Sequence, residues 1–376
     1  MHETSVIDCD MHVLEPATLW LDYLEPGFRS RAIRIERNAL GEEQLIIGDK
    51  VVLERGLAGL GGVHRNRAEL FSGKLTYAQG SPPAAYDPAA RQTLLDEWNV
   101  RASVTFPTIG ILPFPTDDQA LASAYCRAYN TWLAEFAQSV PGRIIPIATV
   151  NWFDVESAIL ELDRCLRLGF RGLFVPPETI GGRSPSHPDF NPLWQRLTDA
   201  GLPGCLHVIV RFSGAASPFA AWREAQPAPG TLFGFGLGAT GQLMPAIAAM
   251  VLDGFFDRFP RQKLVAVEAG CGFAAYLMDR MDEKWRVMSS LGNPLVMPPS
   301  DYIRRNCYFV AEPEERTIGA MLDLVGEDNI LWGSDFPHID ASMDAPEQIR
   351  ASLSALSPER QQRVLGANAA RVFRFP

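Results

Sequence analysis

Aspartate, glutamate and histidine side chains stand at the ends of four short apolar runs of this sequence. The six residues are Asp10, His12, His207, Glu268, Asp335 and His338. Imidazole nitrogens mixed with carboxylate oxygens are the donors that borderline and hard divalent ions take in proteins. A bound divalent ion lowers the pKa of its water from about 15.7 toward about 7 and polarises a substrate oxygen. These residues therefore predict a metal-dependent enzyme, provided that the fold brings them together.

The apolar runs themselves predict the strands of a parallel sheet. Eight such runs, many rich in β-branched residues, are each followed by a stretch with helical spacing. The runs are 5–9, 102–106, 144–150, 172–175, 204–208, 264–268, 307–310 and 330–334. The helices are expected at about 91–99, 117–138, 155–168, 192–200, 242–259, 273–288, 315–325 and 346–373, the last in two pieces. This alternation favours an α/β fold of the TIM type, a (β/α)8 barrel.

A barrel of this kind determines where the six side chains lie. The carboxyl ends of its parallel strands converge on one pocket. Side chains alternate along extended backbone, so Asp10 and His12 are expected on the same face. Each signal taken singly also fits a turn, a cap, a core histidine or a buried ion pair. Their coincidence at the ends of strands 1, 5, 6 and 8 favours the metal site.

Two stretches interrupt the alternation and are predicted to be insertions. Residues 30–88 include a hairpin, with strands at 44–47 and 51–53 joined through Gly48-Asp49-Lys50. Residues 211–241 form a Pro/Gly/Ala-rich segment of loop and helix after the fifth strand. We expect both insertions over the catalytic mouth of a single barrel domain that spans residues 1–376.

Composition and charge indicate which kind of molecule the protein binds. The chain has a formal net charge of -10 and a pI near 5.2, which argues against a nucleic-acid partner and for small-molecule chemistry. No apolar run reaches the roughly 20 residues that a membrane-spanning helix needs, and residues 1–10 lack the features of a signal peptide. The six scattered cysteines are expected to be buried free thiols. We therefore expect a cytoplasmic enzyme with no membrane partner.

Three further side chains are predicted to contact the substrate, each with a plainer alternative. Arg211 follows the fifth strand and can bind a carboxylate with a bidentate fork, or it is a solvated loop arginine. His187 is either a substrate contact or a turn residue, and Trp152 either lines a pocket or packs in the barrel. Residues 236–241 match the dinucleotide fingerprint, but no acid-ended second strand follows, so we expect a flexible glycine loop.

Longer motifs carry a resemblance to a known family. They are Ile7-Asp8-Cys9-Asp10-Met11-His12-Val13-Leu14-Glu15-Pro16, Tyr86-Asp87-Pro88-Ala89-Ala90-Arg91, Leu206-His207-Val208, Leu331-Trp332-Gly333-Ser334-Asp335-Phe336-Pro337-His338 and Gly366-Ala367-Asn368-Ala369-Ala370-Arg371. In these motifs the chain resembles the amidohydrolase superfamily, within it the amidohydrolase-2 or aminocarboxymuconate-semialdehyde-decarboxylase-like branch. The resemblance implies a mononuclear divalent metal, usually zinc or manganese. Its ligands would be Asp10, His12, His207 and Asp335.

Two positions depart from the family's pattern. Many members begin with His-x-His, whereas Asp10 takes the first place here. At strand 6, where members carry a histidine followed by glycines, this chain has Glu268-Ala269-Gly270-Cys271-Gly272. The general-acid role of that histidine therefore does not transfer unchanged. We expect Glu268 either to bind a second ion or to shuttle a proton.

The leading hypothesis is a metal-dependent hydrolase or non-oxidative decarboxylase for a small carboxylated or cyclic substrate. Asp335, Glu268 and His338 are the predicted catalytic residues, and Asp335 would orient a metal-bound water and accept its proton. The expected ion is Zn²⁺ or Mn²⁺, with Fe²⁺ and a second ion left open. One alternative is a dinuclear non-haem iron or iron–manganese oxygenase on the same scaffold. Another is a non-catalytic barrel that serves as a binding partner. The resemblance also implies a homo-oligomer, which we take as a dimer.

Overall fold

The computed structural model describes residues 5–70, 72–111, 116–209, 231–292 and 295–376. The chain forms two compact units. The N-terminal unit comprises residues 6–171 and 334–346, and the C-terminal unit comprises residues 1–5, 172–333 and 347–376. Arg211 and residues 211–230 of the second predicted insertion lie outside the described residues.

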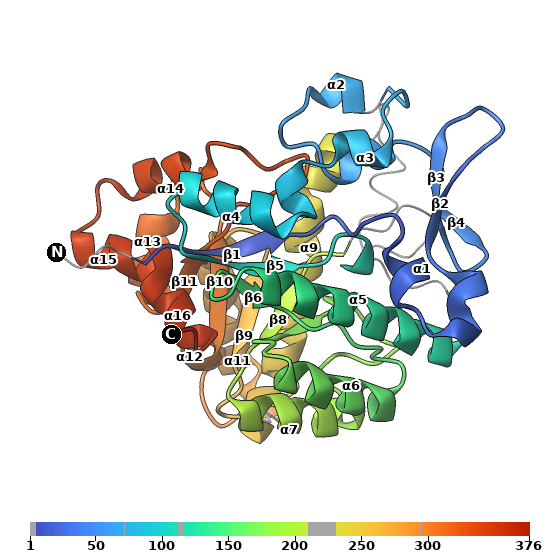
Figure 1. Ribbon diagram of the computed structural model, residues 1–376. Helices are drawn as coiled ribbons and strands as arrows, with labels where there is room; N and C mark the ends of the chain where they lie inside the picture. The colour runs from blue at the N-terminus through green and yellow to red at the C-terminus, as the bar shows by residue number, and fades with distance from the viewer. Residues whose placement is uncertain (1–4, 71, 112–115, 210–230, 293–294) are drawn as a thin grey trace. The chain divides into compact units, whose positions relative to one another are not determined.

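A three-stranded parallel sheet forms the core of the N-terminal unit (Figure 1). Its order is β1 (Ile7–His12), β5 (Ala102–Phe106) and β6 (Ile144–Pro146), and every residue of these strands is buried. Parallel strands covered on both faces read as nearly continuous apolar runs, which is why all three were predictable. Helices alternate with the strands: α4 (Pro88–Glu97), α5 (Gln119–Ser139) and α6 (Val155–Arg167).

Each of these three helices begins at an aspartate. The carboxylates of Asp87, Asp118 and Asp154 accept the backbone N–H of the residue three positions further on. An aspartate in this position stabilises a helix by about 1 kcal/mol relative to alanine. Asp87 is followed by Pro88, which suits the first helical position because it needs no hydrogen-bond acceptor. The cap therefore starts α4 three residues before the predicted beginning at residue 91.

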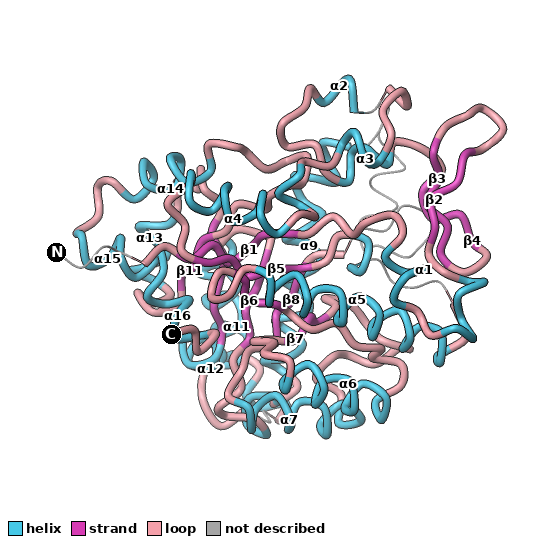
Figure 2. Tube along the Cα trace, in the orientation of Figure 1, coloured by secondary structure: helices cyan, strands magenta, loops and turns pink. Residues whose placement is uncertain are grey.

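An antiparallel sheet of three strands belongs to the same unit and lies beside α1 (Leu19–Tyr23), as Figure 2 shows. The predicted hairpin is confirmed as β3 (Glu43–Ile47) and β4 (Lys50–Leu53). The sequence prediction missed the third strand, β2 (Arg34–Arg37), because its charged residues lack an apolar alternation. Short helical segments follow: η2 (Leu57–Leu60), α2 (Arg67–Leu70) and α3 (Tyr77–Gly80).

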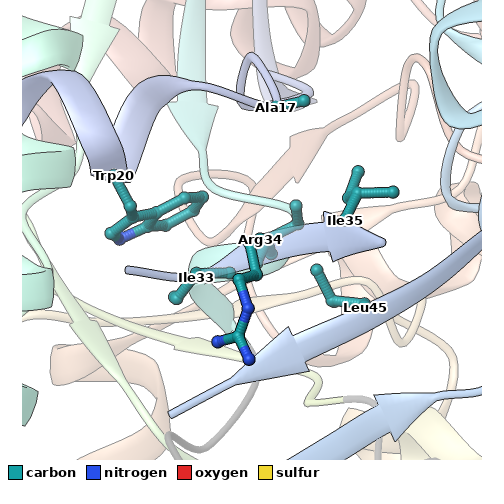
Figure 3. Close-up of a pocket in the computed structure, with 7 residues that line it drawn as sticks. Ala17, Trp20, Ile33, Arg34, Ile35 and Leu45 are labelled. Atoms are coloured by element: carbon teal, nitrogen blue, oxygen red, sulfur yellow. The ribbon is translucent and has the colours of Figure 1, made fainter. Parts of the chain in front are cut away.

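A small apolar pocket joins α1, the antiparallel sheet and the turn after β5 (Figure 3). It is lined by Ala17, Trp20, Ile33, Arg34, Ile35, Leu45 and Ile109. Ile109 is the first residue of the short helix η4 (Ile109–Ile111), which follows β5. The hairpin sheet therefore packs against the segment that leads away from the end of β5.

The C-terminal unit contains a parallel sheet of five strands. Its order is β11 (Ile330–Trp332), β10 (Cys307–Ala311), β9 (Leu264–Val267), β8 (Gly204–His207) and β7 (Leu173–Val175). The helices are α7 (Asn191–Ala200), α9 (Thr231–Leu252), α10 (Phe255–Arg258), α11 (Phe273–Val287), α12 (Pro299–Asn306), α13 (Ile318–Leu324), α14 (Ala345–Leu353), α15 (Pro358–Gln362) and α16 (Asn368–Val372). All eight predicted parallel strands are therefore present. Closure of the three-stranded and five-stranded sheets into one barrel remains a prediction.

Three sequence predictions for the C-terminal unit were wrong in detail. Helix α9 begins at Thr231 and not near residue 242, so the predicted glycine loop at 236–241 is helical. Gly236, Gly238 and Gly241 of this stretch therefore lie within the helix. Helix α12 was missed because its eight residues are largely polar.

Among the described residues, no helix is both long enough and apolar enough to cross a bilayer.

Replacing Gly204 by alanine is expected to destabilise the C-terminal unit. The added Cβ would lie 2.7 Å from the side chain of Trp194 and 3.1 Å from that of Val175. Overpacking of a dense core costs about 1–3 kcal/mol. Gly236→Ala is the matched control, because no atom lies within 4 Å of its added Cβ and alanine favours the helix by about 1 kcal/mol. Urea unfolding should show a lower midpoint for Gly204→Ala only, and equal midpoints would contradict this packing.

Candidate metal centre

Backbone hydrogen bonds place the segment after residue 334 alongside β1 in the N-terminal unit. The amide of Asp335 donates to the carbonyl of Asp10 (2.8 Å), and the amide of His12 donates to the carbonyl of Phe336 (2.6 Å). The residues Asp10, His12 and Asp335 are all buried, with 2%, 0% and 5% of their surface exposed. The predicted end of β1 at residue 9 was wrong, because the strand continues through Asp10 and His12.

The imidazole of His12 faces two carboxylates. Its Nε2 lies 3.2 Å from Oδ1 of Asp10 and 3.3 Å from Oδ1 of Asp335. The first distance confirms that Asp10 and His12 project to the same side of β1. Its Nδ1 lies 2.7 Å from the carbonyl oxygen of Pro107, which accepts only. In the neutral ring Nδ1 therefore carries the hydrogen, and Nε2 keeps its lone pair toward the carboxylates.

Nε2 of His12 and the Oδ1 atoms of Asp10 and Asp335 thus converge. Because all three atoms are electron-rich, they repel one another unless a cation or a proton lies among them. His12, Asp335 and His338 offer ligand atoms that all lie within 4.8 Å of one another. This mixture of nitrogen and oxygen donors fits a divalent ion. The hydrogen bond from Nδ1 of His12 to a carbonyl is also of the kind that orients metal-bound histidines. The side chains of the N-terminal unit therefore fit the ion that the sequence predicted.

His338 is the second histidine of this group. Its Nδ1 lies 2.8 Å from Oδ1 of Asp335, and its Nε2 lies 3.0 Å from the hydroxyl oxygen of Thr108. The centroids of the His338 and His12 rings are 4.0 Å apart. The side chain of His338 is 13% exposed, against 7% for Asp335. Asp335 therefore links His12 and His338, and the side chain of His338 is the most exposed of these three residues.

Two of the predicted catalytic carboxylates have unusual backbone conformations. Asp335 has a φ of +56° and Glu268 has a φ of +62°. A residue with a side chain rarely adopts this left-handed region, and holding one there costs about 1–3 kcal/mol. Such strain is found preferentially at functional sites. Two further described non-glycine residues, Asn99 and Arg374, have a positive φ, so this strain supports the selection of the two carboxylates without being confined to them.

His207 stands at the end of β8 in the C-terminal unit and is fully buried. Its Nδ1 lies 2.8 Å from the carbonyl oxygen of Val208 and 3.6 Å from Oε2 of Glu268. Both neighbours accept, so Nδ1 carries the hydrogen and Nε2 keeps its lone pair, as in His12. Two residues after His207, the backbone N–H of Ile209 donates to the side-chain oxygen of Gln242. The side-chain nitrogen of Gln242 donates in turn to the carbonyl of Ile209. Helix α9 therefore fixes the segment that carries His207.

Glu268 is the first residue of a loop whose backbone is hydrogen-bonded to a second glutamate, Glu315. The carboxylate of Glu315 accepts the backbone N–H groups of Cys271 and Gly272 and the hydroxyl of Thr317. A Cβ added at Gly272 would lie 2.9 Å from the Thr317 hydroxyl and 3.0 Å from Glu315. The glycine permits this close approach, which explains the glycines that follow Glu268 in the sequence.

Two buried charged residues that were assigned no role brace β1. Oδ1 of Asp8 accepts the amides of Asp10 (3.0 Å) and Ser334 (3.1 Å), and burial raises the pKa of this carboxyl to about 7. The guanidinium of Arg91 donates to the carbonyl of His12 (2.5 Å), and burial lowers its pKa to about 10. Both lie within the sequence motifs quoted above. A charged residue inside an otherwise apolar run was the signal that could have identified Asp8.

Glu15 is a third buried residue with a supporting role. Its carboxylate accepts the backbone N–H groups of Thr108 (3.2 Å), Ile109 (2.9 Å) and Gly110 (2.9 Å). Burial raises the pKa of Glu15 to about 7, while these hydrogen bonds oppose the rise. The turn that supplies Thr108 to His338 is therefore held by one side chain.

His187 and Trp152, two of the predicted substrate contacts, lie outside the group formed by Asp10, His12, Asp335 and His338. His187 caps the short helix η5 (Pro188–Phe190), where its Nδ1 accepts the amide of Asp189, so the turn role is present. Trp152 is 4% exposed and lies between β6 and α6. The six cysteines are buried free thiols, as predicted.

A family model described as amidohydrolase matches residues 7–375 of the chain. The chain belongs to the amidohydrolase family. The 2-amino-3-carboxymuconate-6-semialdehyde decarboxylase of Dictyostelium discoideum is 24% identical over 76% of each chain. The gamma-resorcylate decarboxylase of Polaromonas sp. is 27% identical over 76% of this chain and 86% of its own. These relatives confirm the amidohydrolase-2 branch and identify the protein as an enzyme.

Solved structures support the fold of this amidohydrolase. An amidohydrolase from Mycobacterium avium subsp. paratuberculosis K-10 matches with a TM-score of 0.79 at 23% identity, over 99% of this chain and 100% of that one. A dihydroxybenzoic acid decarboxylase from Polaromonas sp. JS666, solved with bound manganese and the inhibitor 2-nitroresorcinol, matches with a TM-score of 0.65 at 18% identity. It covers 99% of this chain and 97% of its own. The family and these neighbours imply a TIM barrel.

The raised pKa of Glu15 predicts a pH-dependent contribution to stability. Because burial raises the folded-state pKa from 4.5 to about 7, the folded protein binds this proton more tightly than the unfolded chain. The resulting stabilisation is fully present below about pH 4.5 and is lost as the pH rises through about 7, a change of about 3 kcal/mol. Glu15→Gln should remove this loss.

The measurement is the unfolding free energy in urea at about pH 5 and about pH 8. The wild type should lose more stability between the two than Glu15→Gln. Glu69→Gln, at an exposed position of α2, is the control and should behave as the wild type. Parallel losses in all three proteins would show that Glu15 does not hold its proton in this way.

Proposed function

We propose that this amidohydrolase is a divalent-metal-dependent, non-oxidative decarboxylase of a small carboxylated aromatic compound. The observation that carries the proposal is the convergence of Nε2 of His12 with oxygens of Asp10 and Asp335 at 3.2 and 3.3 Å. The two decarboxylase relatives, whose names specify carboxylated substrates, favour decarboxylation over hydrolysis.

Asp10, His12 and Asp335 are the proposed ligands of the ion, and His207 is proposed as a fourth ligand because the family resemblance implies it. Manganese or zinc would suit this donor set. When bound, the ion polarises the oxygens of the substrate. His12 would hold the ion through Nε2, because its hydrogen bond to the carbonyl of Pro107 keeps the ring hydrogen on Nδ1.

Proton delivery is assigned to Asp335 and His338. Loss of carbon dioxide from an aromatic ring leaves an electron pair on a ring carbon, which must receive a proton. Nδ1 of His338 lies 2.8 Å from Oδ1 of Asp335, so a proton carried by the imidazolium form of His338 can pass to Asp335 and from there to the ring carbon. The position of His338, more exposed than its neighbours, fits an approach from the substrate side.

Glu268 is proposed as a second group that moves a proton or binds a further ion. Its strained backbone and its part-exposed carboxylate, 19% accessible, support this role. Arg211, His187 and Trp152 remain proposed substrate contacts, and a homodimer remains the expected assembly. Size-exclusion chromatography with light scattering would test the assembly directly.

The first experiment loads the purified protein with Mn²⁺ or Zn²⁺ and assays dihydroxybenzoates and carboxyvanillate for release of carbon dioxide. Decarboxylation that chelator abolishes and added metal restores would support the proposal. Hydrolysis without carbon dioxide release would favour the hydrolase reading. Two redox-active ions per chain with consumption of oxygen would favour the dinuclear oxygenase and end the decarboxylase proposal.

Two substitutions separate proton transfer from metal binding. His338→Gln should lower kcat by about 10²- to 10⁴-fold, the usual contribution of a positioned acid or base, without lowering the metal content. His12→Gln should lower the metal content of the protein, measured by elemental analysis. Asp344→Asn, at an exposed position of the same segment, is the control and should change neither. Full metal content in His12→Gln would remove His12 from the ligand set.

A further inference from the structure

One turn of the N-terminal unit contacts both histidines of the candidate metal centre. The carbonyl of Pro107 accepts Nδ1–H of His12 at 2.7 Å. The hydroxyl oxygen of the next residue, Thr108, lies 3.0 Å from Nε2 of His338. Thr108 is 3% exposed, so solvent does not compete for its hydroxyl. Nothing in the sequence pattern had assigned a role to Thr108.

The direction of the Thr108 hydroxyl is set by the backbone of the turn. Glu15 accepts the N–H groups of three consecutive residues, 108 to 110. A Cβ added at Gly110 would lie 2.8 Å from the Cβ of Pro107 and 3.4 Å from Oε1 of Glu15, so the turn is closed around the carboxylate. The phenol of Tyr77 donates to the backbone carbonyl of Glu15 at 2.9 Å. Thr108 is therefore presented on a rigid support.

The hydrogen bonds at the two ends of the His338 ring are not equivalent. Nδ1 lies 2.8 Å from Oδ1 of Asp335, and the negative charge of this carboxylate favours the neutral ring form with the hydrogen on Nδ1. Nε2 then keeps its lone pair, and the Thr108 hydroxyl is the group that donates to it. The opposite tautomer would direct the lone pair of Nδ1 at a carboxylate, which is repulsive. Asp335 and Thr108 together therefore select one tautomer and one ring orientation.

We propose that Thr108 is a positioning residue for the reaction, whose hydroxyl binds Nε2 of His338 and fixes the ring with Nδ1 beside Asp335. Asp335 contacts one edge of the ring and Thr108 the other, so loss of the hydroxyl removes the hydrogen bond at Nε2 that favours this tautomer and orientation. The proposal rests on the proposed function only where activity is concerned. The tautomer and orientation of His338 are properties of the protein itself.

The test compares Thr108→Val, which keeps the shape and removes the hydroxyl, with Thr108→Ser, which keeps the hydroxyl. Long-range ¹H–¹⁵N spectra of zinc-loaded, histidine-labelled protein report which ring nitrogen carries hydrogen in each of the six histidines. His338→Gln identifies the signals of His338. We expect one tautomer in the wild type and in Thr108→Ser, and a mixture in Thr108→Val.

In the decarboxylation assay Thr108→Val should lower kcat by about 10- to 100-fold, as loss of an outer hydrogen-bond partner commonly does, with KM nearly unchanged. Thr108→Ser should restore kcat. Thr105→Val removes a buried hydroxyl from β5 that bonds to Ser103, and it should leave the His338 signals as in the wild type.

Wild-type His338 signals in Thr108→Val would overturn the proposal, and so would a Thr108→Ser protein no better than Thr108→Val. If the wild type decarboxylates none of the aromatic acids, the proposed function fails while the spectra still decide the role of Thr108. The two failures are therefore distinguishable.

Discussion

Electrostatic repulsion among buried acceptors governs the N-terminal unit. In the neutral form of His12, oxygens of Asp10 and Asp335 face a ring nitrogen that has no hydrogen, because the hydrogen lies on Nδ1 and is donated to Pro107. Burying such groups without a compensating cation costs several kcal/mol, a large part of the roughly 5–15 kcal/mol that stabilises a domain. The surrounding contacts, from Asp8 to two amides and from Arg91 to the carbonyl of His12, keep these atoms together against that repulsion.

The supports of the site extend outward to the hairpin insertion. Ile109, in the turn held by Glu15, lines the pocket whose other walls come from α1 and the antiparallel sheet. The amide of Val63 donates to the carbonyl of Pro337, and Ile339 packs with Ala58 and Leu70. The insertion therefore contacts the segment that carries Asp335 and His338, as well as the turn that carries Thr108.

The sequence pointed to the proposed ligands, whereas the residues that support them went unnoticed. Asp10 and His12 could be paired from the two-residue period of a strand, and Asp335 could be placed because it ends an apolar run. Glu15, Thr108 and Arg91 escaped because residue type alone does not reveal that a polar side chain is buried or which distant amide it binds. Helix α9 was misjudged at its start because glycines weaken the local helix signal.

Glu268 shows how geometry narrows a role that sequence left open. A buried structural ion pair was one interpretation of this residue. In the C-terminal unit the Nδ1 hydrogen of His207 is directed at the carbonyl of Val208, at 2.8 Å, while Oε2 of Glu268 is 3.6 Å away. A carboxylate held mainly for that pair would lie closer and would not need a left-handed backbone. The strain at Glu268, maintained by a loop that Glu315 organises, is easier to explain if the carboxylate must face a reacting group.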